Sequence, residues 1–408
     1  MTSLGISPDR AERSFAVYVA ATVLAELTIQ MVAVAISWQV YYLTGSALNL
    51  GLIGLTEFAP TVCFTPLVGI VADRFNRKLI ACVCLGAQSL ILAALSIASV
   101  AGLIDRNLLL AVVFLLGSTN AFFGPAMSSM LANVVEREQF SKQMARATSA
   151  SQLASLLGPA LGGFLYALNP SAVYAAATLI AALSAALMVF LQVAKRPIPQ
   201  ERASVSSVLS GLTFIRQRRI ILGAILMDLF AVLFGGATAL LPIYARTILK
   251  VGALGLGVLR SAPAFGAGIM SLALARRPIR DRVGHRMFLA VFLFGLATLV
   301  FALSRSFYLS LAMLAALGAA DVISMVIRST LVLAETPDAM RGRVSSVNNL
   351  FVGTSNQLGA FESGVTAGWM GAVAAAVVGG LGTIVVVALW LRLFPALFRV
   401  NEFPREET

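Results

Sequence analysis

The chain has 408 residues, of which 59% are hydrophobic and only 12% are charged, and its formal net charge is +12. A soluble domain carries about a quarter charged residues, so this composition excludes an ordinary soluble protein and places the chain in a lipid bilayer. The cations fall in short loops rather than in one basic domain, which argues against a nucleic-acid partner. One histidine and three cysteines within apolar segments offer no ligand set, so we expect neither a metal nor a cofactor.

Apolar segments long enough to cross a bilayer recur twelve times along the chain, which predicts an all-α membrane protein with twelve transmembrane helices. The first six lie at about 15–43, 48–72, 79–103, 107–131, 144–168 and 171–194. The other six lie at about 219–247, 253–275, 287–304, 307–334, 345–367 and 371–395. The first segment is too long for the apolar core of a signal peptide, so we expect no cleaved leader.

Seven ionisable residues fall in the interior of these predicted spans, away from their first and last turns. A charge in the middle of a bilayer is costly, so each of them is expected to face protein or water and to have a partner. They are Glu26, Glu57, Asp228, Arg260, Asp321, Arg328 and Glu362.

Three of the acids are candidates for binding a proton or a cationic substrate: Glu26 on the first helix, Asp228 on the seventh and Asp321 on the tenth. A carboxyl group in a low-dielectric cavity favours its protonated form, which a proton carrier requires. The alternative for Glu26 and Asp228 is a hydrogen bond between helices, with Gln30 or a neighbour as the partner.

Arg328 follows Asp321 by seven residues, so the two share one face of the tenth helix at a separation of about 10 Å. We expect Arg328 either to bind an anionic group of the substrate or to neutralise an acid such as Glu136 or Glu335.

Glu57 and Arg260 lie just before an Ala-Pro pair on the second and eighth helices. Opposite charges at matched positions near the outer surface suggest an extracellular gate. Local pairing of each residue is the alternative. Glu362, on the outer half of the eleventh helix, is a possible partner of either gate helix.

The link between the second and third helices is short and basic. It reads Gly69-Ile-Val-Ala-Asp73-Arg74-Phe-Asn-Arg77-Lys78. So tight a hairpin places the two helices antiparallel, and its three cations place the link in the cytoplasm. A basic turn without further function is the alternative to a role in gating for Gly69, Asp73, Arg74 and Arg77.

The fifth helix is interrupted by a proline and clustered glycines. The stretch reads Ala154-Ser-Leu-Leu-Gly158-Pro159-Ala-Leu-Gly162-Gly163. Small residues permit close helix packing and proline permits a bend, so we expect this segment to take part in conformational change. Generic helix packing is the alternative.

The longest loop, 195–218, separates an N-terminal six-helix repeat, 1–194, from a C-terminal six-helix repeat, 219–408. Inside it, apolar residues recur at the spacing of one helix face: Val205, Val208, Leu209, Leu212 and Ile215. This stripe predicts a short helix along the membrane surface, and a flexible tether is the alternative.

Four landmarks of the first half reappear in the second half in the same order. The pairs are Glu26 with Asp228, Ala59-Pro60 with Ala262-Pro263, Asp73-Arg74 with Asp281-Arg282, and Glu136 with Glu335. This order predicts two pseudo-symmetric six-helix bundles, from which alternating-access carriers are built. The alternative is that transmembrane composition alone imitates a repeat.

The distribution of cations indicates the orientation of the chain. Of the 30 Lys and Arg residues, 24 fall at the two termini and in the loops on the same side. Only Arg106, Arg246, Lys250 and Arg305 fall in the opposite loops. Both termini are therefore predicted in the cytoplasm.

The loop after the second helix resembles the G-x-x-x-D-R-x-x-R-K motif of the major facilitator superfamily, and Gly158 to Gly163 resembles the fifth-helix motif of its antiporters. Three further runs resemble the bacterial enterobactin-exporter branch, and the likeness covers essentially the whole chain. They are Leu43-Thr-Gly-Ser-Ala-Leu-Asn-Leu-Gly51, Leu241-Pro-Ile-Tyr-Ala245 and Pro337-Asp-Ala-Met-Arg341-Gly-Arg343-Val344.

The resemblance implies the major facilitator fold, with helices 1, 4, 7 and 10 around a central cavity and helices 3, 6, 9 and 12 facing lipid. The lipid-facing set contains none of the seven ionisable residues. The resemblance also implies that Gly69 lets the second helix approach the eleventh. Asp73 would then meet the positive N-terminal end of the eleventh helix, near Arg341 and Arg343, and latch the cytoplasmic side.

We therefore expect a secondary active transporter in the inner membrane of a bacterium. It would export a small organic molecule, a drug-like compound or a siderophore, by proton antiport with alternating access. An uptake symporter and a transport-inactive membrane sensor are the alternatives. An enzyme is not expected, because the sequence shows no nucleophile-base arrangement and no metal-ligand cluster.

Overall fold

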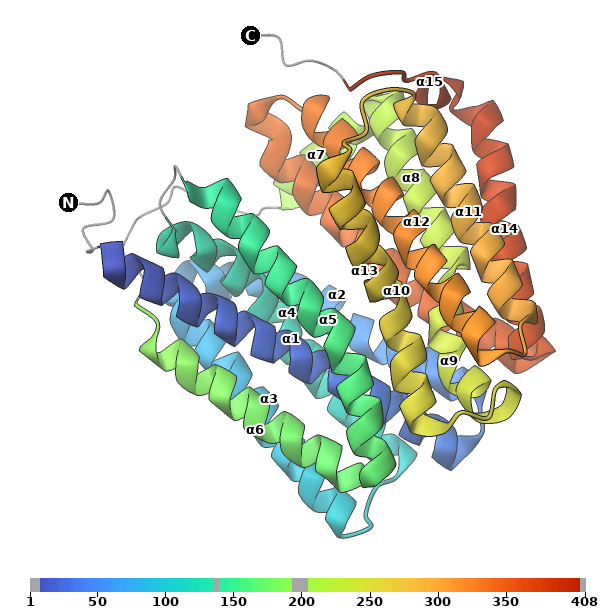
Figure 1. Cartoon of the computed structure of the whole chain (residues 1–408). Coiled ribbons are helices and arrows are strands. Elements are labelled where there is room, and N and C mark those ends of the chain that lie inside the picture. Colours follow the sequence, from blue (N-terminus) through green and yellow to red (C-terminus); the bar gives the residue numbers. More distant parts are fainter. Residues whose placement is uncertain (1–7, 136–138, 193–204, 404–408) are drawn as a thin grey trace. The chain divides into compact units, whose positions relative to one another are not determined.

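The computed structural model describes residues 8–135, 139–192 and 205–403, and every regular element in these ranges is helical (Figure 1). The helices of the first half are α1 (Pro8–Thr44), α2 (Ala47–Arg74), α3 (Arg77–Val100), α4 (Arg106–Val134), α5 (Phe140–Leu168) and α6 (Pro170–Phe190). Sharp caps separate them: the side chain of Asp105 accepts from the backbone N–H of Leu108 at 2.7 Å, and that of Asn169 accepts from Ser171 at 2.9 Å.

The second half begins with a short helix, α7 (Val205–Gln217), and continues with six long ones. The first of these is composite: α8 (Arg219–Phe234), the 3₁₀ turn η2 (Gly236–Leu240), α9 (Leu241–Ile243) and the π turn η3 (Tyr244–Ile248). The others are α10 (Gly252–Arg276), α11 (Val283–Leu303), α12 (Phe307–Ala334), α13 (Asp338–Met370) and α14 (Ala372–Leu393), followed by α15 (Pro395–Phe398).

Eleven helical segments of the described chain are long and apolar enough to cross a membrane. The twelfth predicted span, α13, falls short because polar residues lie along its middle. They include Asn348, Asn349, Asn356 and Gln357. With 33 residues α13 is about 50 Å long, which exceeds the hydrocarbon thickness of a bilayer. It packs against α7, α8 and α14.

The helices form two compact units. One contains Met1–Gly45, Thr56–Glu201 and Gly252–Ser261, and the other contains Ser46–Leu55, Arg202–Val251 and Ala262–Thr408. Each unit therefore holds most of one half of the sequence and also the first turns of α2 or α10 from the other half. The two exchanged segments are the starts of the helices that the repeat relates to each other.

In the first unit, α1 packs on α5 and α6, and α3 packs on α4 and α6 (Figure 1). Its core includes Ala21, Leu85, Met130 and Met188, which are at most 1% exposed. The outward faces of α3 and α6 are apolar, as lipid contact requires. Leu90 of α3, for example, is 73% exposed.

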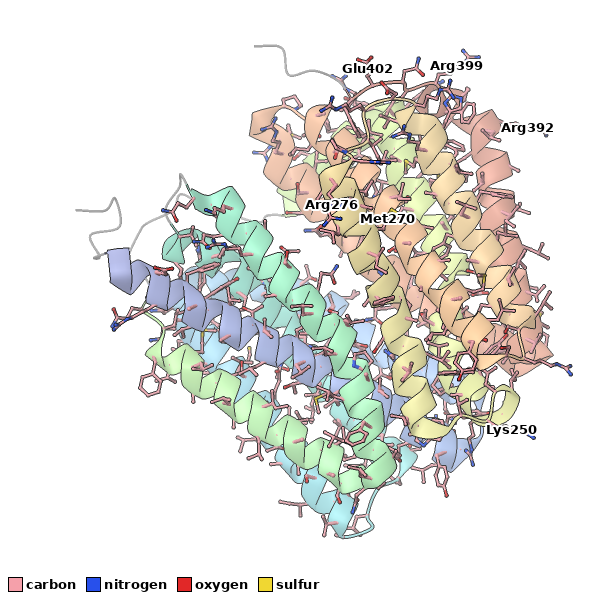
Figure 2. All side chains as sticks on the ribbon, in the orientation of Figure 1. Lys250, Met270, Arg276, Arg392, Arg399 and Glu402 are labelled. Carbon is pink, nitrogen blue, oxygen red and sulfur yellow. The ribbon has the colours of Figure 1, made fainter. Side chains whose placement is uncertain are left out.

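In the second unit, α11 packs on α12 and α14, and α8 packs on α13 and α14 (Figure 1). Trp390 of α14 donates a hydrogen bond to the carbonyl of Gly223 in α8, at 2.9 Å. Lys250 lies at one end of this unit, and Arg392, Arg399 and Glu402 lie at the other (Figure 2).

The linker helix α7 packs against α13. Ile215 is 1% exposed and packs with Val344 and Val347 of α13, and a β-carbon added at Gly211 would lie 2.9 Å from the carbonyl oxygen of Arg343. Leu209 and Leu212 stay exposed. The predicted helix forms, but contacts with α13 anchor it rather than the membrane surface alone. The linker residues up to 204 lie outside the described part of the chain.

Candidate transport site

A buried ion pair joins α8 to α12 in the second unit. The Nη1 atom of Arg328 donates to the Oδ2 atom of Asp228, and each side chain is at most 6% exposed. The predicted partners of Arg328 were a substrate anion, Glu136 or Glu335, and the structure replaces them with Asp228. Glu136 itself lies outside the described residues.

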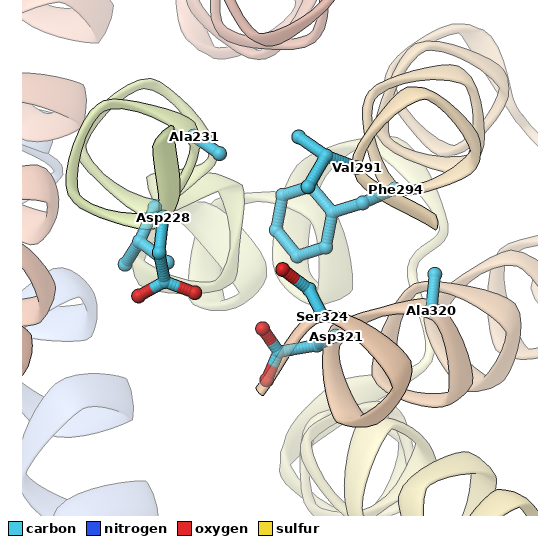
Figure 3. Close-up of a pocket in the computed structure, with 8 residues that line it drawn as sticks. Asp228, Ala231, Val291, Phe294, Ala320, Asp321 and Ser324 are labelled. Carbon is cyan, nitrogen blue, oxygen red and sulfur yellow. The ribbon is translucent and has the colours of Figure 1, made fainter. Parts of the chain in front are cut away.

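Asp321 lies beside this pair but has a different environment. Figure 3 shows the carboxyl groups of Asp228 and Asp321 facing the same space between α8 and α12. Asp321 has no hydrogen-bond or ion-pair partner among the described residues, and Asp228 and Arg328 are the charged groups that act on it. The charge of Asp228 is thus neutralised by Arg328, whereas the carboxyl group of Asp321 is available to water or a ligand.

The space between the two carboxyl groups is a small cavity of about 10 Å³, room for about one water molecule. Val291 and Phe294 of α11 and Ala320 of α12 supply apolar walls (Figure 3). Ser324 also lines it, is 3% exposed, and has no partner for its hydroxyl among the described residues. The cavity therefore offers a donor and an acceptor next to Asp321.

The cluster can hold one exchangeable proton. With Asp321 protonated, Asp228 and Arg328 compensate each other and the group is neutral. With Asp321 ionised, the group carries one unpaired negative charge in a region of low dielectric, which is costly unless a proton or a cationic group binds.

Glu26 occupies a different kind of place, in the first unit. Its Oε1 atom accepts hydrogen bonds from Gln30 at 2.8 Å and from Ser155 of α5 at 3.0 Å. This is the interhelical contact that the sequence offers as the alternative. A role in binding protons or substrate stays a prediction for Glu26.

Glu57 and Arg260 fall in the same compact unit. Glu57 is the acid whose charge acts on Arg260, and the Arg260 Nη1 atom donates to the hydroxyl of Ser37 at 3.4 Å. Glu362 accepts from Thr366 of its own helix at 2.8 Å. The gate role of Glu57 and Arg260 stays a prediction.

The glycines of α5 separate into two faces. A β-carbon on Gly158 would lie 2.6 Å from the β-carbon of Gln30, and one on Gly162 would lie 2.7 Å from the carbonyl oxygen of Met31, so this face packs on α1. A β-carbon on Gly163 would lie 2.9 Å from the α-carbon of Gly257, at the start of α10. The carbonyl oxygen of Pro159 approaches Gly257 still more closely, at 2.5 Å from an added β-carbon.

The second unit repeats this glycine contact. A β-carbon on Gly51, at the start of α2, would lie 3.0 Å from the α-carbon of Gly364 in α13. Gly51 and Gly257 begin repeat-related helices, as α5 and α13 are repeat-related. The sequence analysis did not single out Gly51, Gly257 or Gly364. The repeat offset of 203 between Ala59-Pro60 and Ala262-Pro263 pairs Gly257 with Gly54, one turn after Gly51, where an added β-carbon would lie 2.9 Å from the β-carbon of Ala360 in α13.

The loop motif connects α2 to α3 as predicted. Gly69, Asp73 and Arg74 lie in the last turns of α2, and Arg77 begins α3. The side chain of Asp73 is not among those the structure describes, so its latch with Arg341 and Arg343 at the start of α13, and the helix approach at Gly69, stay predictions.

Residues 18–360 match the family model described as Major Facilitator Superfamily. The chain is 26% identical over 414 residues to proteins named enterobactin exporter EntS from Escherichia coli O1:K1 / APEC and Shigella boydii serotype 18, with 99% of this chain and 97% of each relative covered.

Solved structures share the fold. The nucleoside transporter NupG superimposes with a TM-score of 0.66 at 14% identity, over 94% of this chain and 99% of that one. A bacterial homolog of the human lysosomal transporter Spinster, inward-facing and occupied, gives a TM-score of 0.70 at 15% identity over 97% of both chains. At these identities the likeness concerns the fold alone, and it confirms the predicted arrangement of two helical bundles.

Proposed function

Because the chain belongs to the Major Facilitator Superfamily and is a membrane transporter rather than an enzyme, we propose that it exports a small organic molecule in exchange for protons. The full-length likeness to enterobactin exporters supports export and a siderophore or drug-like substrate. The bacterial inner membrane is the setting these relatives suggest. The excess of cations in one set of loops supports cytoplasmic termini.

The observation that carries the proposal is the cluster of Asp228, Arg328 and Asp321. Asp228 and Arg328 form the fixed ion pair, and Asp321 is the residue that takes up and releases the proton. It is the acid of the three candidates without a partner among the described residues, since Glu26 accepts two hydrogen bonds and Asp228 accepts from Arg328.

Antiport follows from competition at this cluster. When Asp321 is ionised, its negative charge attracts a cationic or hydrogen-bond-donating group of the substrate. When a proton binds Asp321, that attraction is lost and the substrate is released. Proton and substrate therefore occupy the cluster in turn, and the cycle moves them in opposite directions.

The remaining predicted residues have roles in gating. Glu57 with Arg260, and the α5 glycines with Gly257, act at the start of α10. Asp73, at the C-terminal end of α2, acts with Arg341 and Arg343, at the N-terminal end of α13. The chain divides into repeats 1–194 and 219–408 joined by 195–218.

Transport into proteoliposomes with an imposed pH gradient tests the proposal, with a panel of siderophores and drug-like cations as substrates. Because Asn mimics the protonated carboxyl group, we expect Asp321→Asn to abolish transport driven by the pH gradient and also to weaken exchange of substrate across the membrane without a gradient. The matched control, Asp105→Asn, changes an acid in a loop outside the cluster and keeps both activities.

Three results would contradict the proposal. Gradient-driven transport by Asp321→Asn at the wild-type rate would remove Asp321 from proton coupling. Movement of substrate in the same direction as protons would establish symport. Absence of transport for every compound in the panel would favour the sensor.

A further inference from the structure

An open groove runs along the first unit between α2, α3 and α4. Its volume is about 520 Å³, within the range of about 300–1,000 Å³ that holds small organic ligands. It is remote in sequence and chemistry from the cluster of Asp228, Arg328 and Asp321, and transport as proposed above makes no use of it.

The walls of the groove are apolar. Phe64 of α2 and Phe122 of α4 lie with their ring centroids 5.8 Å apart, and Val83 of α3 is 62% exposed. Two hydroxyl groups also line it, but both are already used: Ser118 donates to Phe114 at 2.7 Å and Thr119 donates to Leu116 at 2.8 Å. With these two donors used and the rest of the lining apolar, the groove suits a hydrocarbon chain better than a polar molecule.

The groove has the depth of one leaflet. Its lining on α3 extends from Leu79 to Ala87, close to the start of that helix at Arg77. These positions reach about 15 Å into the bilayer from Arg77 at 1.5 Å per residue, half of the hydrocarbon thickness of about 30 Å. An extended acyl chain of a phospholipid covers the same depth.

Three cations lie close in sequence to the lining residues Phe75 and Leu79, at the end of the groove where α2 meets α3. Lys78 donates to the carbonyl of Val189 at 2.7 Å, which leaves two of its three N–H donors for another partner. Arg77 reaches the carbonyl of Ser129 at 3.5 Å. Arg74 is exposed. In the part of the chain that the structure describes, none of the three has an acidic partner.

We propose that this groove is a binding site for an anionic phospholipid, with one acyl chain between α2, α3 and α4 and the phosphate held by Arg74, Arg77 and Lys78. A lipid chain at this place would fill the space between α2 and its neighbours and so support the second helix. Occupancy would depend on headgroup charge, because each cation near a membrane surface attracts anionic lipid.

Native mass spectrometry of the full chain, released from nanodiscs that hold equal amounts of phosphatidylglycerol and phosphatidylcholine, tests the proposal. We expect a retained phosphatidylglycerol on the wild-type protein. Val83→Trp fills the groove at an exposed position and is expected to remove that lipid. Leu90→Trp places the same side chain on the same helix, outside the groove lining, and is expected to keep it.

The charge is tested separately. We expect Arg74→Gln and Lys78→Gln each to weaken phosphatidylglycerol retention about fivefold and to leave phosphatidylcholine unchanged. Arg286→Gln, the equivalent of Lys78 in the second copy of the loop motif, is expected to change neither.

Two outcomes would overturn the proposal. One is equal retention of the two lipids by the wild-type protein. The other is equal retention of phosphatidylglycerol by Val83→Trp and Leu90→Trp. That outcome overturns the proposal even where Val83→Trp blocks the binding of an organic substrate, because the lipid then stays bound with the groove filled. Thermal unfolding of each variant establishes that the fold is kept before the lipids are compared.

Discussion

Removing one member of the Asp228–Arg328 pair is the most informative perturbation of the second unit. The two side chains are 6% and 5% exposed, and the Nε atom of Arg328 has no other partner among the described residues. Asp228→Asn therefore leaves a buried guanidinium without its counter-charge. Breaking a buried pair in this way costs about 3–5 kcal/mol, because the remaining charge keeps its desolvation penalty.

Thermal unfolding in detergent, followed by the loss of the monodisperse peak in size-exclusion chromatography, measures this cost. At about 2–4 °C per kcal/mol for a unit of this size, we expect Asp228→Asn to lower Tm by about 10 °C. Adding Arg328→Gln removes the orphaned charge, so the double variant is expected to recover most of that loss. Asp281→Asn, an exposed acid in the loop before α11, is the matched control and changes stability by less than about 0.5 kcal/mol.

The reasoning fails if Asp228→Asn melts at the same temperature as Asp281→Asn. It also fails if the double variant is no more stable than Asp228→Asn alone, since the loss would then come from packing rather than from an unpaired charge.

Three further expectations concern the other predicted sites. Asp73→Asn reaches the membrane in normal amounts but transports far more slowly, as membrane abundance and proteoliposome uptake show together; unchanged transport would reduce the loop to a topology signal. Gly257→Val overlaps the α5 backbone and stalls transport, whereas Gly86→Val, where an added β-carbon meets nothing within 4 Å, does not; equal rates for both would refute the close contact. Glu26→Gln is expected to weaken the hydrogen bond with Ser155 by about 1 kcal/mol or less and to keep transport. If transport by this variant no longer depended on pH, Glu26 would be the proton site instead.

Eleven of the twelve predicted spans are recognisable from hydropathy, because a helix in lipid satisfies its own backbone hydrogen bonds and must then show an apolar surface. The contact of Glu26 with Gln30 could also be predicted, because residues four apart share a helix face. The pairing of Arg328 with Asp228 could not be predicted, because residues 100 apart in sequence meet only when packing has fixed the rotation of α8 and α12. The contact of α7 with α13 could not be predicted either, because an apolar stripe indicates that a face is buried but not whether lipid or α13 buries it. The position of α7 at the membrane surface stays a prediction.

The exchanged first turns of α2 and α10 have a consequence for biogenesis. The unit built mainly from the first half of the sequence also contains Gly252–Ser261. Chains emerge from the ribosome N-terminus first, so this unit stays incomplete until α10 has been synthesised, although α1 to α6 have already left the ribosome. The contact of Gly163 with Gly257 then closes it. A chain ending in the linker would hold six membrane helices and still lack part of its first folded unit.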